Sequence, residues 1–418
     1  MKQINKEASR RELVSWVLYD FANSSFTTFI VTVGYSVYFK SYVASNREYG
    51  DFLWGLAVSL SMAFVALSSP VLGAIADFSG SKKLFLAIYS WICIAFTCLL
   101  FFIEKGSNIA GMAVFAVANV GFEGAYAFYN GFLPEIATRE KMGRISGYGW
   151  AVGYLGGLLS LAIVYPLIKG GLAPGNIMNF RLSFPVIGLF FFIFSIPVLV
   201  FLKERAEKRR GLSLTAYVSE GFRRLGHTFR ILGSYRELLR FLVAYFIYND
   251  AICTVIAFSS IFAVDTLKFT LQEVMIFFIS IQTTSFIGAF AFGYLLDRIG
   301  AKKTIMITLL IWIGVVTGVY FTETKFAYYV VGFIAGIAIG SSQSASRTML
   351  GLMTPPEKSA EFFGFYEFCG KASGIIGPVL FGAVSSFTGN QRNGILVILG
   401  LFVTGMFLMR KVSDVRAN

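Results

Sequence analysis

The sequence predicts an all-α membrane protein whose 12 transmembrane helices form two pseudo-symmetric six-helix bundles. Three observations support this prediction: the composition, the regular recurrence of long apolar stretches, and an internal repeat. Of the 418 residues, 56% are hydrophobic and only 14% are charged, whereas about 25% of residues are charged in a soluble domain. The mean hydropathy is +0.69. These values exclude a soluble enzyme, a disordered chain and a disulfide-stapled secreted domain.

Glycine, proline and charged residues divide the chain into stretches that are long enough to cross a bilayer, which takes about 20 apolar residues. The first half contains six of them, near residues 13–40, 51–76, 83–103, 108–134, 143–168 and 181–202. The second half contains six more, near residues 238–264, 271–296, 303–322, 326–352, 360–387 and 393–410. The apolar pattern therefore predicts twelve spans.

The positions of the basic residues predict the orientation of these spans. With the N-terminus in the cytoplasm, 26 of the 36 lysines and arginines fall in cytoplasmic segments, eight fall outside, and Arg347 and Lys371 lie within spans. Cytoplasmic loops of membrane proteins carry such an excess of positive charge. We therefore expect a multi-pass protein of a bacterial inner (plasma) membrane with both termini cytoplasmic. The net charge of +13 reflects this topology, so we expect the lipid bilayer and no nucleic acid as a partner.

One long polar connection, residues 203–237, separates the two halves. It predicts an N-terminal bundle over residues 1–202 and a C-terminal bundle over residues 238–418. Within the connection, apolar residues from Leu214 to Leu232 recur at helical spacing, with arginines on the other side of the turn. This pattern is typical of an amphipathic helix that lies along a membrane surface.

A short loop motif occurs once in each half. Its first copy contains Gly73, Asp77, Gly80, Lys82 and Lys83, and its second contains Gly293, Asp297, Arg298, Gly300, Lys302 and Lys303. The two copies coincide at an offset of 220 residues, except that Phe78 replaces the arginine in the first. Glycine allows close helix packing, and the charged residues belong at the membrane surface. The motif therefore predicts a paired gating element at the cytoplasmic face.

A second correspondence, at an offset of 217 residues, relates the fourth and fifth spans to the tenth and eleventh. It aligns the polar residues Asn119, Glu123, Tyr126 and Asn130 with Gly336, Gly340, Gln343 and Arg347. Both sets have the spacing of one helix face. Ala22-Asn23 and Tyr248-Asn249 also match, and each of these helices carries a carboxylate, Asp20 or Asp250.

The doubled loop and the six-plus-six arrangement resemble the major facilitator superfamily over the whole chain. The first-helix motif Trp16-x-x-Tyr19-Asp20-Phe-Ala-Asn23-Ser and the seventh-helix motif Tyr245-Phe-x-Tyr248-Asn249-Asp250 are similar to the vacuole-effluxer-like branch. The resemblance implies a substrate cavity between two bundles that opens alternately to each side. It also implies a secondary transporter of amino acids or similar small solutes.

Six charged side chains lie well inside predicted spans rather than near their ends: Asp20, Glu123, Asp250, Arg347, Glu367 and Lys371. A charge near the bilayer centre costs at least about 2.5 kcal/mol, so such residues are candidates for function. Asp20 and Asp250 fit either a protonation site or structural pairing, and Asp250 could also bind a substrate amine or Na⁺. Arg347 could neutralise an acid or hold an anionic group of the substrate.

The remaining assignments follow from position. Glu123 lies on a continuous polar face, and we expect it to face a central cavity that it shares with Arg347. Glu367 and Lys371 are one helical turn apart, which favours a local ion pair over a direct role in transport. The polar candidates for lining the cavity are Asn23, Asn119, Tyr126, Asn130, Asn249 and Gln343.

The sequence therefore predicts a secondary active transporter of a small solute that works by alternating access. We expect it to be a monomer that couples efflux of amino acids or related metabolites to protons through Asp20, Glu123 or Asp250. Na⁺ in place of protons is the alternative coupling ion. An enzyme acting on a lipid-type substrate and a non-transporting receptor are the alternatives. No nucleotide-binding loop or nucleophile motif supports an enzyme, and the four cysteines lack the paired spacing of a metal site. We expect no metal and no cofactor.

Overall fold

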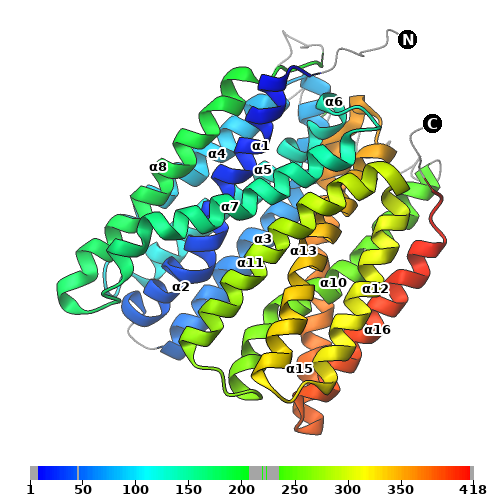
Figure 1. Cartoon of the computed structure of the whole chain (residues 1–418). Helices are drawn as coiled ribbons and strands as arrows, with labels where there is room; N and C mark the ends of the chain where they lie inside the picture. Colours follow the sequence, from blue (N-terminus) through cyan, green and yellow to red (C-terminus); the bar gives the residue numbers. More distant parts are fainter. Residues whose placement is uncertain (1–7, 45–46, 207–218, 220–222, 224–234, 415–418) are drawn as a thin grey trace. The chain divides into compact units, whose positions relative to one another are not determined.

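The structure is a computed structural model that describes residues 8–44, 47–206, 219, 223 and 235–414, and these residues form helices joined by short turns (Figure 1). They divide into two compact units. The first unit comprises the described residues of Met1–Ile136, Val152–Phe222 and Glu357–Gly364. The second comprises those of Ala137–Ala151, Arg223–Pro356 and Phe365–Asn418.

The first unit contains the N-terminal helices and the start of one C-terminal helix. Its elements from the N-terminal half are α1 (Arg10–Ser25), the π-helix η1 (Phe26–Val33), α2 (Tyr35–Tyr38), the π-helix η2 (Phe39–Val43), α3 (Arg47–Ser79), α4 (Lys82–Leu99), η3 (Leu100–Phe102), α5 (Asn108–Gly131), α6 (Leu133–Ile136), most of α7 (Met142–Ile168), η4 (Pro174–Asn176) and α8 (Ile177–Phe201). From the C-terminal half it includes most of the short 3-10 helix η6 (Pro356–Lys358) and the beginning of α14 (Ser359–Ser373).

The second unit contains the C-terminal helices and the start of α7. Its complete helices are α10 (Arg236–Asp265), α11 (Leu271–Ile299), α12 (Ala301–Phe321), α13 (Lys325–Met353), α15 (Ile376–Thr388) and α16 (Gln391–Arg410). Two helices are divided between the units. The first part of α7, up to Ala151, belongs to the second unit and the rest to the first, whereas the first part of α14, up to Gly364, belongs to the first unit and the rest to the second.

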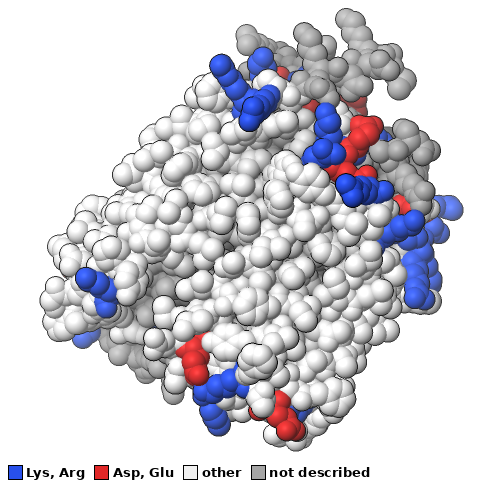
Figure 2. Space-filling view, viewed as in Figure 1, with Lys and Arg blue, Asp and Glu red and all other residues white. Residues whose placement is uncertain are grey.

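Eleven helical segments in the described residues are long and apolar enough to cross a membrane. Their sides carry exposed apolar residues such as Leu67 and Phe326, which are 72% and 79% exposed. On the face in view, charged side chains gather near helix ends and leave the sides of the helices uncharged (Figure 2). Large apolar side chains exposed along such helices are what a lipid environment requires.

The first predicted span, near residues 13–40, is helical but irregular. α1 begins with a capping box in which the Ser9 hydroxyl accepts from the Glu12 N–H and the Glu12 carboxylate accepts from the Ser9 N–H. Two π-helical segments, η1 and η2, then interrupt the α-helical path. π-helical turns are rare and concentrate at functional sites. The apolar count could not reveal them, because it does not depend on the hydrogen-bond pattern.

The eleventh predicted span, near residues 360–387, is broken into α14 and α15. The helix stops at Ser373 and resumes at Ile376. Pro378 provides the physical reason, because a proline lacks an N–H and its ring clashes with the carbonyl of the residue four positions earlier, here Gly374. A discontinuous helix leaves polar backbone groups inside the membrane that neighbouring side chains must satisfy.

The predicted amphipathic helix of the connection falls almost entirely outside the described residues. Its apolar residues Leu214, Val218, Phe222, Leu225, Phe229 and Leu232 all lie outside the described residues. Only the two ends of the connection, residues 203–206 and 235–237, are described over more than one consecutive residue.

Candidate functional site

In the first unit, the motif residues of α1 meet the polar face of α5. The Tyr129 hydroxyl donates to the Asp20 carboxylate over 2.9 Å, and the Tyr126 hydroxyl donates to the Asn23 side-chain oxygen over 3.2 Å. Asp20 and Asn23 are buried. Two residues of the predicted first-helix motif are therefore hydrogen-bonded to α5, at neighbouring turns of both helices.

Trp16 fixes the tyrosine that binds Asp20. Its indole N–H donates to the Tyr129 carbonyl oxygen over 3.0 Å, and the two rings stack with their centroids 4.5 Å apart. Both side chains are fully buried. A buried tyrosine that is held at its backbone and its ring has few alternative rotamers, so Tyr129 presents its hydroxyl to Asp20 in a defined position.

The other members of the predicted polar stripe also lie inside the first unit. Asn119, Glu123 and Asn130 are buried on α5, and the Asn119 amide donates to the Ser61 hydroxyl of α3 over 2.7 Å. Buried polar side chains are costly unless they form hydrogen bonds. The stripe therefore forms a row of buried polar side chains within the first unit.

In the second unit, Asp250 of α10 caps the start of α15. Both carboxylate oxygens accept from the Gly377 N–H, over 2.9 and 2.7 Å. Gly377 is the second residue of α15, and Asp250 is 1% exposed. The unpaired N–H groups and the dipole of a helix N-terminus stabilise a carboxylate in this position.

Asn249, the neighbouring residue, binds the other side of the same break. Its amide donates to the Ser373 hydroxyl over 2.7 Å and to the Gly370 carbonyl oxygen over 3.3 Å, both at the end of α14. Asn249 and Asp250 therefore hold the two ends of the broken eleventh span. The seventh-helix motif therefore binds the ends of α14 and α15, a contact that the sequence did not reveal.

Arg347 of α13 is fully buried and contacts the beginning of α7 within the second unit. Its guanidinium donates to the Ser146 hydroxyl over 3.0 Å and to the Ser146 carbonyl oxygen over 2.6 Å. The guanidinium carbon lies 5.2 Å from the centre of the Trp150 ring. Neutral oxygens and an aromatic face thus stabilise the buried positive charge.

The remaining predicted residues of the second unit lie on α13 and α14. Glu367 and Lys371 form an ion pair over 3.7 Å, which is the local pairing that their spacing favours. Gln343 is half-buried on α13. Beside these residues, the Tyr245 and Tyr366 rings stack with centroids 4.2 Å apart, so α10 and α14 share a buried aromatic contact.

The first copy of the repeated loop joins α3 and α4 to the start of α14. The Asp77 carboxylate accepts from the backbone N–H groups of Ala360 and Glu361, over 3.2 and 2.8 Å. The Lys82 ammonium lies 3.4 Å from Asp77 and donates to the Ser359 hydroxyl over 2.7 Å. Lys82 therefore provides the cation next to Asp77, although this copy has Phe78 where the second has arginine.

The second copy of the loop makes the corresponding contact with the start of α7. The Asp297 carboxylate accepts from the backbone N–H groups of Gly143 and Arg144, over 2.9 and 3.3 Å, and from the Arg144 guanidinium over 2.6 Å. In both copies the aspartate therefore binds the second and third residues of a helix. The cation differs, because Arg144 comes from α7 whereas Lys82 belongs to the motif itself.

Two motif glycines make the tight turns that these contacts need. Gly80 and Gly300, between α3 and α4 and between α11 and α12, have φ angles of 64° and 89°. Residues with a side chain rarely adopt such angles. The repeated glycine is therefore required by the turn, while the lysines after it begin the next helix.

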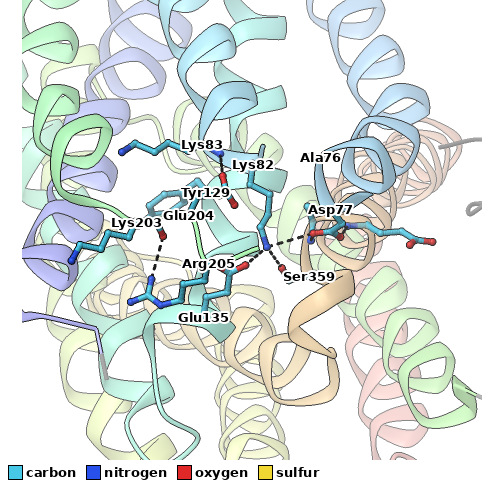
Figure 3. Close-up of polar contacts among 12 residues, drawn as sticks. Ala76, Asp77, Lys82, Lys83, Tyr129, Glu135, Lys203, Glu204, Arg205 and Ser359 are labelled. Atoms are coloured by element: carbon cyan, nitrogen blue, oxygen red, sulfur yellow. Dashed lines mark hydrogen bonds and ion pairs between the residues drawn. The ribbon is translucent and has the colours of Figure 1, made fainter. Parts of the chain in front are cut away.

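A cluster of charged residues surrounds Lys82 at the end of the first unit (Figure 3). The Lys82 ammonium also bonds to Glu135 of α6. Glu204, just after α8, accepts from the backbone N–H of Lys83 over 2.9 Å. One oxygen of Glu135 and one of Glu204 are buried with no hydrogen-bond partner among the described residues. The cluster thus contains three carboxylates, Asp77, Glu135 and Glu204, close to one buried ammonium group.

Because Glu204 is buried in this cluster, we expect the stability of the folded protein to change with pH as Glu204 titrates. Burial, with the charges of Glu135 and Asp77, raises the pKa of Glu204 from 4.5 to about 7, although the Lys83 N–H and Lys82 oppose the shift. The folded protein therefore binds this proton more tightly than the unfolded chain does. We expect the thermal stability of the purified protein to fall as pH rises from 4.5 through 7.

The measurement is the thermal unfolding midpoint in detergent across this pH range. Glu204→Gln should remove part of the decline, whereas Glu323→Gln, a change of an exposed glutamate outside the cluster, should leave it unchanged. An identical decline in the wild type and Glu204→Gln would show that other groups carry it.

Sequence reasoning missed several residues that complete these sites. Tyr129, Glu135, Arg144 and Trp150 all bind predicted residues, but none stands out in the sequence. Glu135 and Arg144 lie at predicted helix ends, where charged residues are ordinary. Tyr129 follows Tyr126 by three positions, so its helical spacing was the one available signal.

Sequence comparisons relate the whole chain to a family of membrane transporters. The family described as "Vacuole effluxer Atg22 like" matches residues 53–418. The uncharacterized MFS-type transporter YxiO of Bacillus subtilis (strain 168) is 28% identical over 99% of this chain and 96% of its own length. Autophagy-related protein 22 of Yarrowia lipolytica is 26% identical over 73% of this chain, which spans 57% of that relative.

Solved structures show the same fold at low sequence identity. The human organic anion transporter MFSD10 has a TM-score of 0.75 and 14% identity, with 96% of this chain and 99% of that chain covered. The proton:xylose symporter XylE has a TM-score of 0.76 and 14% identity, with coverage of 97% and 96%. These similarities confirm the predicted all-helical major facilitator fold. The family match over most of the chain shows that this multi-pass membrane protein belongs to the vacuole effluxer Atg22-like family of major facilitator transporters.

Proposed function

We propose that the protein is a proton-coupled secondary transporter that exports amino acids or related small metabolites by alternating access. The observation that carries the proton coupling is the environment of Asp250. This carboxylate is almost fully buried, accepts from a single backbone N–H, and has no cation within ion-pair distance among the described residues. The N-terminus of α15 stabilises this carboxylate only in part, and a buried charge without a paired cation favours uptake of a proton or a cation.

Asp20 and Glu123 supply further carboxylates for the same process. Asp20 accepts from the Tyr129 hydroxyl, and Glu123 is buried on the polar face of α5. The substrate would bind to polar side chains of α1, α5 and α10, which include Asn23, Asn119, Tyr126, Asn130 and Asn249. Arg347, held by Ser146 and Trp150, would face the same central cavity as Glu123.

The two loop copies would act as gates at the cytoplasmic face. Asp77 and Asp297 each bind the beginning of a helix, so opening that face requires these hydrogen bonds to break. Charge-assisted hydrogen bonds of this kind are stronger than neutral ones. The proposal includes cytoplasmic termini and an inner-membrane location, which the distribution of basic residues supports.

Flux in proteoliposomes tests this function. The purified protein is first screened for thermal stabilisation by amino acids, peptides, sugars and metal salts, because a ligand that binds the folded state raises its apparent stability. The stabilising solute is then followed with and without a pH gradient. We expect accumulation against its concentration gradient only when the pH gradient is present.

Other outcomes of the same experiment identify other mechanisms. Accumulation that follows a Na⁺ gradient would replace the proton by Na⁺, and equilibration without accumulation would identify a facilitator. If a solute binds but no flux occurs, the protein is a receptor on a transporter fold. Chemical conversion of the solute would identify an enzyme.

A further inference from the structure

A pocket in the second unit carries unbalanced positive charge. It has a volume of about 700 Å³ and lies at the turn between α11 and α12, where the start of α7 and the end of α13 complete its wall. Four basic residues line it: Arg139, Arg298, Lys302 and Lys303. Three of them, Arg298, Lys302 and Lys303, belong to the second copy of the repeated loop.

The pocket is lined by four basic and two acidic residues and therefore has a net positive charge. Asp297 is already bound to Arg144 and to two backbone N–H groups of α7. Lys302 donates to the Arg410 carbonyl oxygen over 2.9 Å rather than to a carboxylate. Among the described residues, Arg298 and Lys303 have no carboxylate within ion-pair distance, and both side chains are exposed. Asp414 is the remaining acidic residue of the lining.

The two loop copies differ in how their lysines are paired, which accounts for the net positive charge of the second. In the first unit, Lys82 is buried against Asp77 and Glu135. In the second, Arg144 takes the place of that lysine beside Asp297, so Lys302 is displaced from the aspartate. The same motif therefore forms a closed ionic cluster once and a basic pocket the second time.

The pocket also has an apolar side. Ile299, Met306 and Ile307 line it together with the basic residues, and Ile307 is 37% exposed on the side of α12. α12 is one of the helices that are long and apolar enough to cross the membrane. The pocket thus joins a polar surface to a helix side suited to lipid, which is the boundary where a phospholipid carries its phosphate above its acyl chains.

We infer that this pocket binds the phosphate of an anionic phospholipid from the cytoplasmic leaflet. Arg298 and Lys303 supply the charges, Arg139 and Lys302 complete the polar wall, and the apolar residues contact the upper acyl chains. Basic pockets between transmembrane helices on the cytoplasmic side suit such head groups, and each Lys or Arg near an anionic surface contributes about 1 kcal/mol, or about a five-fold gain in affinity. The inference rests on the proposed orientation of the loops and is independent of the transported solute.

Native mass spectrometry of the protein from nanodiscs tests the inference. The nanodiscs contain phosphatidylcholine with a minor fraction of phosphatidylglycerol, and retained lipids are counted for the wild type and two variants. Arg298→Gln/Lys303→Gln removes two charges from the pocket. Arg10→Gln/Arg11→Gln removes two exposed charges at the start of α1 and serves as the matched control. We expect the affinity of the pocket variant for phosphatidylglycerol to fall by about thirty-fold, so that it retains far less of this lipid, while the control retains as much as the wild type.

The outcomes separate the possible ligands. Equal retention of phosphatidylglycerol by the pocket variant and the control overturns the inference. Competition by inorganic phosphate or glycerol phosphate at low millimolar concentration would also overturn it, because the ligand would then be a soluble phosphate. Thermal unfolding of both variants in detergent shows whether they fold, and a solute flux that remains in the pocket variant keeps this result separate from the transport function.

Discussion

Asp250→Asn is expected to abolish accumulation driven by a pH gradient while leaving exchange of substrate across the membrane largely intact. Asparagine has the same shape as aspartate, and its side-chain oxygen can still accept from the Gly377 N–H that Asp250 binds. The break between α14 and α15 therefore keeps its cap. The change removes titration alone, so a carrier that moves a proton with its substrate loses the link to the gradient.

The measurement compares uphill uptake and equilibrium exchange of the same solute in proteoliposomes. Glu123→Gln and Asp20→Asn are measured in parallel, because either carboxylate could carry the proton instead. Glu323→Gln, which changes an exposed glutamate between α12 and α13, controls for loss of negative charge. If all three membrane variants accumulate substrate as the wild type does, proton coupling through these groups is wrong and a facilitator or Na⁺-coupled mechanism replaces it.

Most of the fold could be predicted from the sequence because the membrane imposes a strong and simple pattern. Each span needs an apolar length, and Lys302 and Lys303 mark a loop as clearly as Lys82 and Lys83 do. The two irregular spans could not be predicted in this way. The π-helical path after Ser25 and the break after Ser373 preserve apolar length, and Pro378 alone indicated the second.

The residues of the candidate site that follow a regular pattern in the sequence could be predicted, but their partners could not. The loop aspartates were found because they recur at a fixed offset, and Asp77 and Asp297 do make equivalent contacts. The polar stripe was found because its residues have the spacing of one helix face. Their partners were not predicted, since Ala360 and Gly143 contribute backbone N–H groups that any residue has. The different cations beside the two aspartates, Lys82 and Arg144, likewise depend on tertiary packing rather than on the repeat.

Gly73→Ala is expected to cause the largest loss of stability among the glycine changes in the two loop copies. A Cβ atom at Gly73 would lie 2.3 Å from the Ala360 carbonyl oxygen and 3.0 Å from the Glu361 Cα atom. These are backbone atoms of α14, so the clash cannot be relieved by a side-chain rotation. Either α14 must move away from α3, or Asp77 must give up its hydrogen bonds to the Ala360 and Glu361 N–H groups.

Two further glycines allow the effect to be ranked. At Gly293, the matching position of the second copy, the Arg144 Cα atom would lie 3.2 Å from the new Cβ, which is tight but not prohibitive. At Gly55, on the same helix as Gly73, there is nothing within 4 Å. Overpacking a helix contact costs about 1–3 kcal/mol, whereas alanine in place of glycine within an open helix stabilises it by about 0.5–1 kcal/mol.

The thermal unfolding midpoint should therefore be lowest for Gly73→Ala, intermediate for Gly293→Ala, and equal to or above the wild type for Gly55→Ala. The same order should hold for the rate of solute exchange, because a displaced α14 also loses the contact between Lys82 and Ser359. A Gly73→Ala protein as stable as Gly55→Ala would show that α14 does not pack against α3 at this distance. The capping of α14 by Asp77 would then fail as the basis for the proposed gate.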